Sequence, residues 1–257
     1  MPLKAVILAG GFGTRISEES HLRPKPLIEI GGKPILWHIM KIYSHHGIND
    51  FVICCGYKGY MIKEYFANYL LHMSDVTINL ETSTLTTHRH TAEPWSVTLI
   101  DTGINSGTGG RLKNIQHCID DTFCMTYGDG VSNVNISELL QFHKEQKTFA
   151  TVTGIEPASK YGKISINGAK VTSFEEKPSE LNKTWINGGF FVLEPDIFSF
   201  IKNETEFFEN GPLEKLVKQN QLSMYQHKDF WSAMDTLRDK NELENLWDGG
   251  MAPWKVW

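Results

Sequence analysis

Short apolar runs separated by polar, glycine-rich segments recur through the first half of the chain. Three of these runs, residues 4–8, 51–55 and 123–127, are dominated by apolar side chains. Such runs are typical of strands that a parallel sheet buries on both faces. Residues 35–46 carry apolar side chains at helical spacing instead, and Gly47 follows them as a C-terminal cap.

The same half holds further helical and strand patterns. Helical patterns lie at residues 60–72, 112–119 and 136–147. Asn135 directly precedes the last of them and predicts an N-cap, with Glu138 in the first turn. Two strand patterns, residues 76–80 and 97–100, flank a polar stretch that contains His88, Arg89 and His90. Because these histidines have no partner cluster, we expect a solvated loop there rather than a metal site.

The pattern changes after residue 150. Residues 163–166 and 170–174 flank Asn167-Gly168, which is a strong turn signal for a β-hairpin. A strand is predicted over residues 188–193, and helices are predicted near Ile197, near Leu213 and over residues 237–247. Thr236 and Asp239 have the spacing of a capping box for the last helix. We therefore predict one α/β domain, a doubly wound, mostly parallel, Rossmann-like sheet with a small β-hairpin portion.

Composition excludes several classes of protein. Hydrophobic residues make up 40% of the chain and charged residues 21%, which argues against disorder. The net charge is -5, whereas nonspecific binding of nucleic acid requires a basic surface. No apolar run approaches the roughly 18 residues that a membrane span needs. We therefore expect a cytoplasmic protein that binds neither nucleic acid nor membranes.

The four cysteines, Cys54, Cys55, Cys118 and Cys124, show no C-x-x-C spacing. Adjacent cysteines in a strand point to opposite faces, so Cys54 and Cys55 cannot hold one metal together. We expect four reduced, mostly buried thiols.

A glycine-rich loop directly follows the first predicted strand. Gly10, Gly11 and Gly13 let backbone N–H groups approach an anion, and the loop leaves a sheet strand where open α/β folds bind ligands. The loop matches neither the dinucleotide fingerprint, whose third glycine is replaced by Ile16, nor a P-loop, which needs Gly-Lys-Ser/Thr. A tight turn without a ligand remains the alternative on the glycines alone.

Lys25 is the second candidate phosphate ligand. It lies between Pro24 and Pro26, which stiffen the backbone and limit the positions that its ammonium can visit. Exposed lysines are usually only solvated, but a proline-flanked lysine near a glycine loop is a better candidate.

Together, Gly-Gly-x-Gly-Thr-Arg and the later Arg-Pro-Lys-Pro resemble the signature of the sugar-1-phosphate nucleotidyltransferases over nearly the whole chain. The resemblance implies one domain, in which residues 1–150 mainly bind nucleotide and residues 151–247 mainly bind sugar phosphate. It implies that Arg15 and Lys25 are catalytic, on the leaving phosphates and the α-phosphate. The implied nucleotide-binding residues are Leu8, Ala9, Gly10, Gly11, Phe12, Gly13, Thr14, Arg15, Lys25, Gly109, Arg111 and Gly128.

Two carboxylates are candidate Mg²⁺ ligands. Asp129 follows a predicted strand between Gly128 and Gly130, and Asp235 precedes a predicted helix. A turn aspartate and a helix cap are the respective structural alternatives. Mg²⁺ is usually held by one or two carboxylates plus substrate phosphates, and the resemblance assigns both positions to that role.

The resemblance also implies a sugar-phosphate site in the second half. The segment Glu-Glu-Lys-Pro is similar to the family's sugar-phosphate motif, although such charge alternation is normally a solvated strand end. The implied residues are Tyr161, Gly162, Glu176, Lys177 and Asn187. Lys177 would hold the phosphate, and Glu176 would accept hydrogen bonds from sugar hydroxyls.

The base is expected to lie against the glycine-rich turn that ends in Thr108-Gly109-Gly110-Arg111. Plain helix capping is the alternative for this turn. The sequence Thr-Gly-Gly-Arg resembles the cytidylyltransferase branch of the family, which implies CTP and glucose 1-phosphate as substrates and a pathway to deoxysugar or surface-polysaccharide precursors. An Arg111 guanidinium could pair its N–H donors with O2 and N3 of cytosine, whereas uracil presents a donor at N3.

Three other functions compete with the cytidylyltransferase expectation. They are thymidylyl or uridylyl transfer to a hexose 1-phosphate, a noncatalytic nucleotide-sugar-binding module, and a dinucleotide dehydrogenase, which lacks the full glycine fingerprint. The presence of Arg15, Lys25, Asp129, Lys177 and Asp235 favours the enzyme. We also expect a homo-oligomer in which Trp254 and Trp257, in the tail 248–257, dock on a neighbouring subunit.

Overall fold

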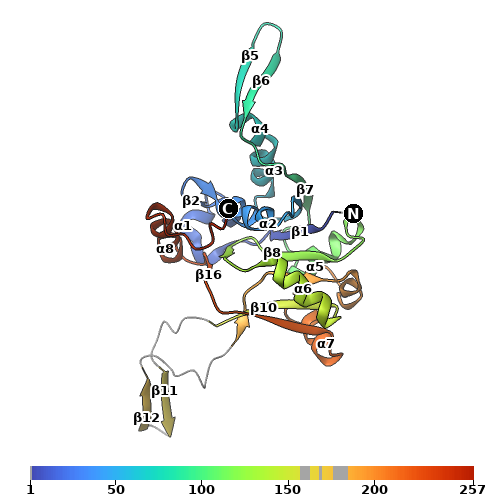
Figure 1. Ribbon diagram of the computed structural model, residues 1–257, viewed down its shortest axis with the longest axis vertical. Coiled ribbons are helices and arrows are strands. Elements are labelled where there is room, and N and C mark those ends of the chain that lie inside the picture. The colour runs from blue at the N-terminus through green and yellow to red at the C-terminus, as the bar shows by residue number, and fades with distance from the viewer. Residues whose placement is uncertain (1, 157–162, 168–169, 176–184) are drawn as a thin grey trace.

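The computed structural model describes residues 2–156, 163–167, 170–175 and 185–257, and a mixed eight-stranded sheet runs through its centre (Figure 1). The strand order is β13-β10-β14-β8-β1-β4-β7, and β15 also pairs with β10. These strands are β1 (Lys4–Ala9), β4 (Asp50–Cys55), β7 (Ser96–Asp101), β8 (Phe123–Tyr127), β10 (Ala150–Ile155), β13 (Ile186–Asn187), β14 (Phe191–Leu193) and β15 (Leu222–His227).

The sheet has a wholly parallel part and a mixed part, in which β15 is parallel to β10 whereas β13 is antiparallel to it. Strands β8, β1, β4 and β7 run parallel to one another, whereas β14 is antiparallel to both β8 and β10. The predicted α/β, Rossmann-like fold is thereby confirmed. The carboxyl ends of β1 and β8 lie side by side, because Leu8 is in register with Tyr127.

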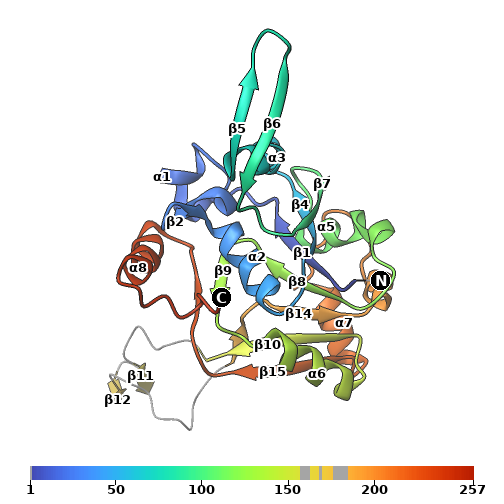
Figure 2. The same cartoon turned by 45° about the horizontal axis from the view of Figure 1, so that its top comes forward.

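Strand β1 shows why the parallel part is apolar throughout. Ala5 and Ile7 belong to one buried cluster, together with helix α2 (Ile35–His45), whereas Val6 and Leu8 belong to a second one. Because successive side chains of a strand point to opposite faces, both faces of this strand are covered. The second cluster includes residues of α5 (Thr108–Asn114), the 3₁₀ helix η5 (Pro195–Phe200) and α7 (Pro212–Lys218). Figure 2 shows α2 and α7 away from one another, with the sheet between them.

Two predicted helices are shorter or shifted. The helix expected over residues 60–72 is divided into α3 (Gly59–Ala67) and α4 (Tyr69–His72), because Asn68 between them leaves the helical conformation. The helix expected over residues 112–119 begins earlier, as α5, and ends in the 3₁₀ helix η3 (Gln116–Cys118).

The expectation of a solvated loop around His88, Arg89 and His90 was wrong. These residues end strand β6 (Thr84–His90), which pairs with β5 (Ser74–Asn79) in a hairpin that projects from the domain (Figure 1). The strand is exposed along its whole length, as predicted for polar residues, but cross-strand backbone hydrogen bonds and β-branched threonines stabilise it without a buried face.

Both capping predictions are confirmed. The Asn135 side chain accepts a hydrogen bond from the backbone N–H of Glu138 at the start of α6 (Ile136–Gln146). Thr236 and Asp239 form a reciprocal capping box on α8 (Leu237–Asp248).

The second half has the predicted hairpin and a strand that is shorter than predicted. Strand β11 (Lys163–Asn167) pairs antiparallel with β12 (Lys170–Glu175), and Gly168 of the predicted turn lies outside the described residues. The strand expected over residues 188–193 begins only at Phe191, as β14, because Gly189 and Phe190 have positive φ values of 74° and 47°; the short strand β13 lies before the predicted range.

Short elements surround the parallel edge. They are the 3₁₀ helix η1 (Thr14–Ile16), α1 (Ser17–Ser20), the 3₁₀ helix η2 (Lys25–Leu27), and the paired short strands β2 (Glu29–Ile30) with β3 (Lys33–Pro34) and β9 (Gly130–Ser132) with β16 (Trp231–Ala233). All four cysteines are free, as predicted, and only Cys118 is not fully buried.

The C-terminal tail packs on its own chain, which corrects the expectation for Trp254, whereas docking of the partly exposed Trp257 on a neighbouring subunit stays a prediction. Trp254 is fully buried, and its ring stacks on Phe230 and on Trp247. Trp257 lies edge-on to Trp37. Both tryptophans of the tail therefore pack against their own domain, whereas Met251 is exposed.

His38 connects this tail to the core. The imidazole is fully buried, and its Nε2 lies 2.8 Å from the carbonyl of Ile30, so Nε2 carries the proton. Nδ1 then accepts a hydrogen bond of 3.3 Å from the indole N–H of Trp254. Burial lowers the pKa of His38 from 6.5 to about 4, because a protonated ring would be desolvated and would confront the Trp254 donor.

Acidification should therefore destabilise the fold. The unfolded chain binds a proton at His38 below pH 6.5 and the folded chain only below about 4, so the free energy of unfolding should fall over that window, by about 3 kcal/mol in total. Urea unfolding followed by tryptophan fluorescence across this range measures the loss. His38→Gln should flatten the pH dependence, whereas His88→Gln, in the exposed hairpin, should leave it unchanged. Equal pH profiles for the three chains would contradict this account.

Candidate functional site

A cleft of about 480 Å³ opens at the carboxyl ends of β1 and β8, and we call it the loop cleft. The glycine loop forms one wall, and Gly13 adopts a positive φ of 65° that favours glycine. The cleft brings together every predicted nucleotide-binding residue except one, namely Leu8, Ala9, Gly10, Gly11, Phe12, Gly13, Thr14, Arg15, Lys25, Arg111 and Gly128.

The exception is Gly109, which lies in the first turn of α5 and is buried. A Cβ at this position would lie 2.8 Å from the carbonyl oxygen of Glu206. The glycine is therefore required for close packing of α5 against the loop around Glu206 and does not line the loop cleft.

Four alternating charges cross the loop cleft. The Lys25 ammonium donates hydrogen bonds of 2.6 Å to Oδ2 of Asp129 and 2.8 Å to Oδ1 of Asp235. Arg15 donates through Nη1 to the other oxygen of Asp235, at 2.8 Å. The sequence predicted all four residues as ligands of phosphate or metal, and the structure brings them into one cluster.

Secondary structure fixes the two carboxylates beside one another. Strand β9 begins directly after Asp129 and pairs antiparallel with β16, which ends two residues before Asp235. The backbone N–H of Met234 also donates to the Asp129 carbonyl at 2.9 Å. The capping residue Asp239 accepts from the Asp235 N–H at 3.2 Å, so the start of α8 holds the second carboxylate in place.

The carboxylate pair suits a divalent cation that also binds substrate phosphates. One oxygen from each of Asp129 and Asp235 converges on a single ammonium, so the pair already surrounds the position of a point charge. No group of three or more potential ligands from histidine, cysteine, aspartate and glutamate occurs among the described residues. Two carboxylates plus phosphate oxygens are a typical Mg²⁺ environment.

Arg111 lies in the loop cleft, as predicted, but its donors meet the protein itself. Nη1 donates to Oγ1 of Thr102 and to the Gly103 carbonyl, each at 2.8 Å, and Nη2 donates to the Gly10 carbonyl at 2.9 Å. A Cβ at Gly10 would lie only 2.1 Å from Nη1, so the guanidinium packs directly on the glycine loop. In this structure the Arg111 donors are thus engaged by backbone carbonyls and by Thr102, and their pairing with cytosine stays a prediction.

Of the predicted sugar-phosphate residues, the structure describes Asn187. Tyr161, Gly162, Glu176 and Lys177 lie outside the described residues. Asn187 is exposed in β13, and its Nδ2 donates to the Tyr127 hydroxyl at 3.1 Å. Tyr127 lines the loop cleft, so this hydrogen bond joins Asn187 to a residue of the cleft wall, although Asn187 does not itself line the cleft.

The turn that was expected to lie against the base contributes four further residues to the wall of the loop cleft, namely Ile104, Asn105, Ser106 and Thr108. Sequence reasoning missed three residues of the wall, namely Pro26, Tyr127 and Phe207. Tyr127 could have been inferred from its place directly before Gly-Asp-Gly, and Pro26 from its place beside Lys25. Phe207 had no local signal, because only the folded chain brings it to the cleft.

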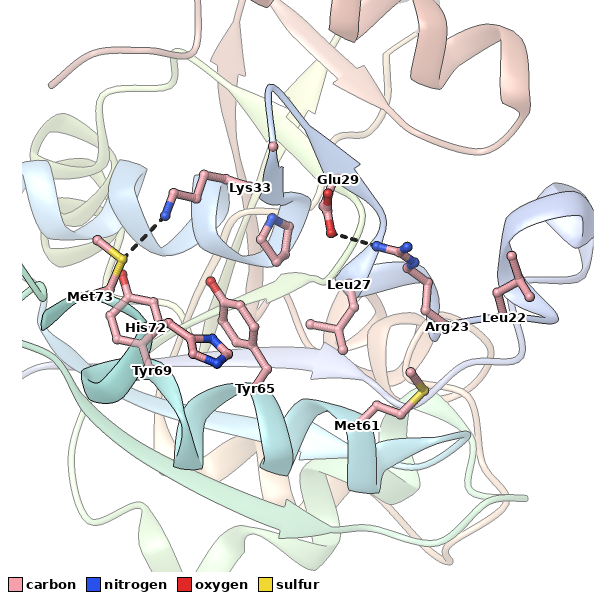
Figure 3. Close-up of a pocket in the computed structure, with 12 residues that line it drawn as sticks. Leu22, Arg23, Leu27, Glu29, Lys33, Met61, Tyr65, Tyr69, His72 and Met73 are labelled. Carbon is pink, nitrogen blue, oxygen red and sulfur yellow. Dashed lines mark hydrogen bonds and ion pairs between the residues drawn. The ribbon is translucent and has the colours of Figure 1, made fainter. Parts of the chain in front are cut away.

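A second cavity, of about 530 Å³, lies between residues 22–34 and helices α3 and α4 (Figure 3). It contains none of the predicted site residues. The charged groups that line it interact with protein atoms, as in the 2.7 Å ion pair of Arg23 with Glu29 and the contact of Lys33 with the Met73 sulfur. The loop cleft is therefore the better candidate for chemistry.

None of the helices within the described residues is both long enough and apolar enough to cross a membrane.

Comparisons with known proteins agree on one family. The profile of the nucleotidyl transferase family matches residues 4–245. The chain is 54% identical to glucose-1-phosphate cytidylyltransferase of Salmonella typhimurium, over 99% of this chain and 100% of the relative. It is 43% identical to a probable glucose-1-phosphate cytidylyltransferase of Bacillus subtilis, with the same coverage.

Solved structures share the fold. The crystal structure of HddC from Yersinia pseudotuberculosis matches with a TM-score of 0.69 at 23% identity, over 95% of this chain and 99% of that one. An apo UDP-glucose pyrophosphorylase matches with the same TM-score at 19% identity, over 97% and 99%.

Removal of the Lys25 charge should make the carboxylate pair a better metal site. Without nucleotide, Lys25→Met should bind Mn²⁺, which prefers the same oxygen ligands as Mg²⁺, at least about tenfold more tightly than the unchanged chain. Electron paramagnetic resonance of free Mn²⁺ measures the affinity, and Lys33→Met, in the second cavity, is the matched control. An equal or weaker affinity in Lys25→Met would show that the ammonium does not occupy the cation position.

Proposed function

Because the chain belongs to the nucleotidyl transferase family, we propose that it transfers a cytidylyl group from CTP to α-D-glucose 1-phosphate, giving CDP-glucose and pyrophosphate. The observation that carries this proposal is the convergence of Lys25, Asp129 and Asp235 beside the glycine loop. The relatives that are named as glucose-1-phosphate cytidylyltransferases, at 54% and 43% identity, support the choice of substrates.

The glycine loop and the two cations act on the triphosphate. Backbone N–H groups of Gly10 to Gly13 can approach phosphate oxygens because no side chain intervenes at the glycines. Arg15 is the more exposed cation, with 72% of its side chain accessible, and it suits the leaving β- and γ-phosphates. Lys25, with 10% accessible, is held deeper and suits the α-phosphate under attack.

The reaction requires no covalent intermediate with the protein. A phosphate oxygen of glucose 1-phosphate attacks the α-phosphorus, a new P–O bond forms, and the bond between the α-phosphorus and the bridging oxygen breaks to release pyrophosphate. A phosphate monoester with a second pKa near 6 is already a nucleophile at neutral pH. Alignment of the two substrates and neutralisation of the phosphate charges then account for catalysis.

Mg²⁺ is the cofactor that we propose for the Asp129 and Asp235 pair. When bound, it would neutralise phosphate charge during the transfer. Asp129 lies directly at the end of β8 and should be the more sensitive ligand, whereas Asp235 is also held by the start of α8.

The sugar site is proposed for the antiparallel side of the cleft. Asn187 lies there through its contact with Tyr127. Lys177 and Glu176 would hold the phosphate and hydroxyls of the sugar, with Tyr161 and Gly162 completing the site, by resemblance to the family motif. We also propose a cytoplasmic homo-oligomer that supplies precursors of deoxysugars or surface polysaccharides.

Arg111 serves the base indirectly in this proposal. By binding carbonyls of both the glycine loop and the Gly103–Ile104 turn, the guanidinium sets the distance between the two walls of the cleft. Base selection then follows from backbone groups and from Ile104 and Asn105, which line the cleft beside Arg111.

A pyrophosphate-release screen tests the substrates. CTP with glucose 1-phosphate should exceed UTP, dTTP and GTP by at least about tenfold in kcat/KM, because one unpaired polar group costs about 1–3 kcal/mol. Chelation of metal should abolish turnover. Equal use of UTP or dTTP would refute the cytidylyl assignment while leaving nucleotidyl transfer in place. Tight nucleotide binding without pyrophosphate release from any pair would favour the noncatalytic binding module.

Arg111→Lys should raise the KM for CTP at least about tenfold and narrow the preference for CTP over UTP, because a single ammonium cannot replace bonds to several carbonyls. Initial rates with both nucleotides measure the effect. Lys113→Arg, on the same helix, is the control and should keep both constants. A wild-type KM for CTP in Arg111→Lys would show that the contact with the loop does not shape the nucleotide site.

A further inference from the structure

The Glu209 carboxylate joins two walls of the loop cleft. Its Oε2 accepts a hydrogen bond of 2.5 Å from Oγ1 of Thr108, at the start of α5. Its Oε1 accepts one of 2.5 Å from the hydroxyl of Tyr127, at the end of β8. Thr108 and Tyr127 both line the cleft, whereas Glu209 stands behind them.

These bonds determine which atoms donate and which accept in a longer chain of hydrogen bonds. A carboxylate accepts only, so Tyr127 must donate its single hydroxyl proton to Glu209. The Tyr127 oxygen is then free to accept from Nδ2 of Asn187, at 3.1 Å. Burial, followed by the nearby Glu209 charge, raises the pKa of Tyr127 well above its ordinary value, which keeps this proton in place.

The orientation of the Asn187 amide follows from this chain. Its Oδ1 accepts from the Gly189 N–H at 2.8 Å, so both ends of the amide are assigned. Only one of the two Nδ2 hydrogens is used by Tyr127, and Asn187 is exposed. Among the described residues no second acceptor contacts Nδ2, so its other hydrogen can donate to a hydroxyl or phosphate oxygen of a ligand bound beside Tyr127.

The loop that carries Glu209 is anchored without this carboxylate. The Gly107 N–H donates to the Glu204 carbonyl at 3.0 Å, and the Gly110 N–H donates to the Glu206 carbonyl at 3.1 Å. Phe208, next to Glu209, is fully buried, and its N–H donates to Oγ1 of Thr108 at 2.8 Å. Loss of the Glu209 charge should therefore leave the loop in place and change only the hydrogen-bond chain.

We propose that Glu209 is a positioning residue for the sugar substrate. It acts through Tyr127 to present the free Nδ2 donor of Asn187 to glucose 1-phosphate. This inference rests on the proposed function and on the placement of Asn187 in the sugar site.

Glu209→Gln and Tyr127→Phe test the chain. A glutamine at position 209 carries its own N–H donor, so the Tyr127 hydroxyl can accept from it and donate to Asn187 instead. The Asn187 amide can then flip, which exchanges its Oδ1 and Nδ2 atoms. Each variant should raise the KM for glucose 1-phosphate about tenfold and change the KM for CTP by less than about threefold. The double variant should be no worse than Tyr127→Phe alone, because both substitutions interrupt one chain.

Glu206→Gln is the matched control in the same loop. Its carboxylate accepts from the Lys202 N–H and from Lys215, so this variant should lower thermal stability without changing the ratio of the two KM values. Equal rises in both KM values for Glu209→Gln, or additive effects in the double variant, would overturn the proposal. If the wild-type chain uses another substrate pair, the proposed substrates are wrong, and the KM ratio is measured on that sugar 1-phosphate.

Discussion

Burial of the Lys25 ammonium between Asp129 and Asp235 is the interaction on which the loop cleft depends. A buried ammonium costs several kcal/mol unless opposite charges accompany it. Its partners follow β8 and β16, which are far apart in the sequence, and Pro24 and Pro26 restrict the lysine backbone. The requirement to pair one charge therefore holds together the first segment, the middle of the sheet and the start of α8.

The same pairing makes the free cleft electrically balanced. Arg15 and Lys25 supply two positive charges, and Asp129 and Asp235 supply two negative ones. In the proposed reaction, Asp129 and Asp235 would hold a divalent cation that offsets part of the triphosphate charge, and Lys25 would then pair with phosphate instead of carboxylate. Each buried charge would thereby keep a partner of opposite sign.

Local signals in the sequence were sufficient to predict much of the fold and many of the residues that line the loop cleft. The apolar runs predicted β1, β4 and β8, and the caps at Asn135 and Thr236 were correct because capping depends on residues only three apart. Strand β5 was predicted by its pattern at residues 76–80, but β6 was missed because it is exposed along its whole length and has no buried face to impose a hydrophobic pattern. The tail was misjudged because the site that receives Trp254 is built from residues near His38 and Phe230, which no local pattern connects to it.

Arg111 and Glu209 show why residue type alone could not assign roles within the cleft. A guanidinium in a cleft suggests contact with a ligand, yet the N–H groups of Arg111 donate to the carbonyls of Gly10 and Gly103. A glutamate beside a cleft proposed to bind anions would suggest repulsion, yet the half-buried Glu209 carboxylate accepts from Thr108 and Tyr127 and does not itself line the cleft. In both cases a charged group that could have met the substrate is satisfied by the protein. The charged side chains of Arg15, Lys25 and Asp129 still line the cleft beside the glycine loop, whereas Arg111 and Glu209 contribute through the geometry that their hydrogen bonds maintain.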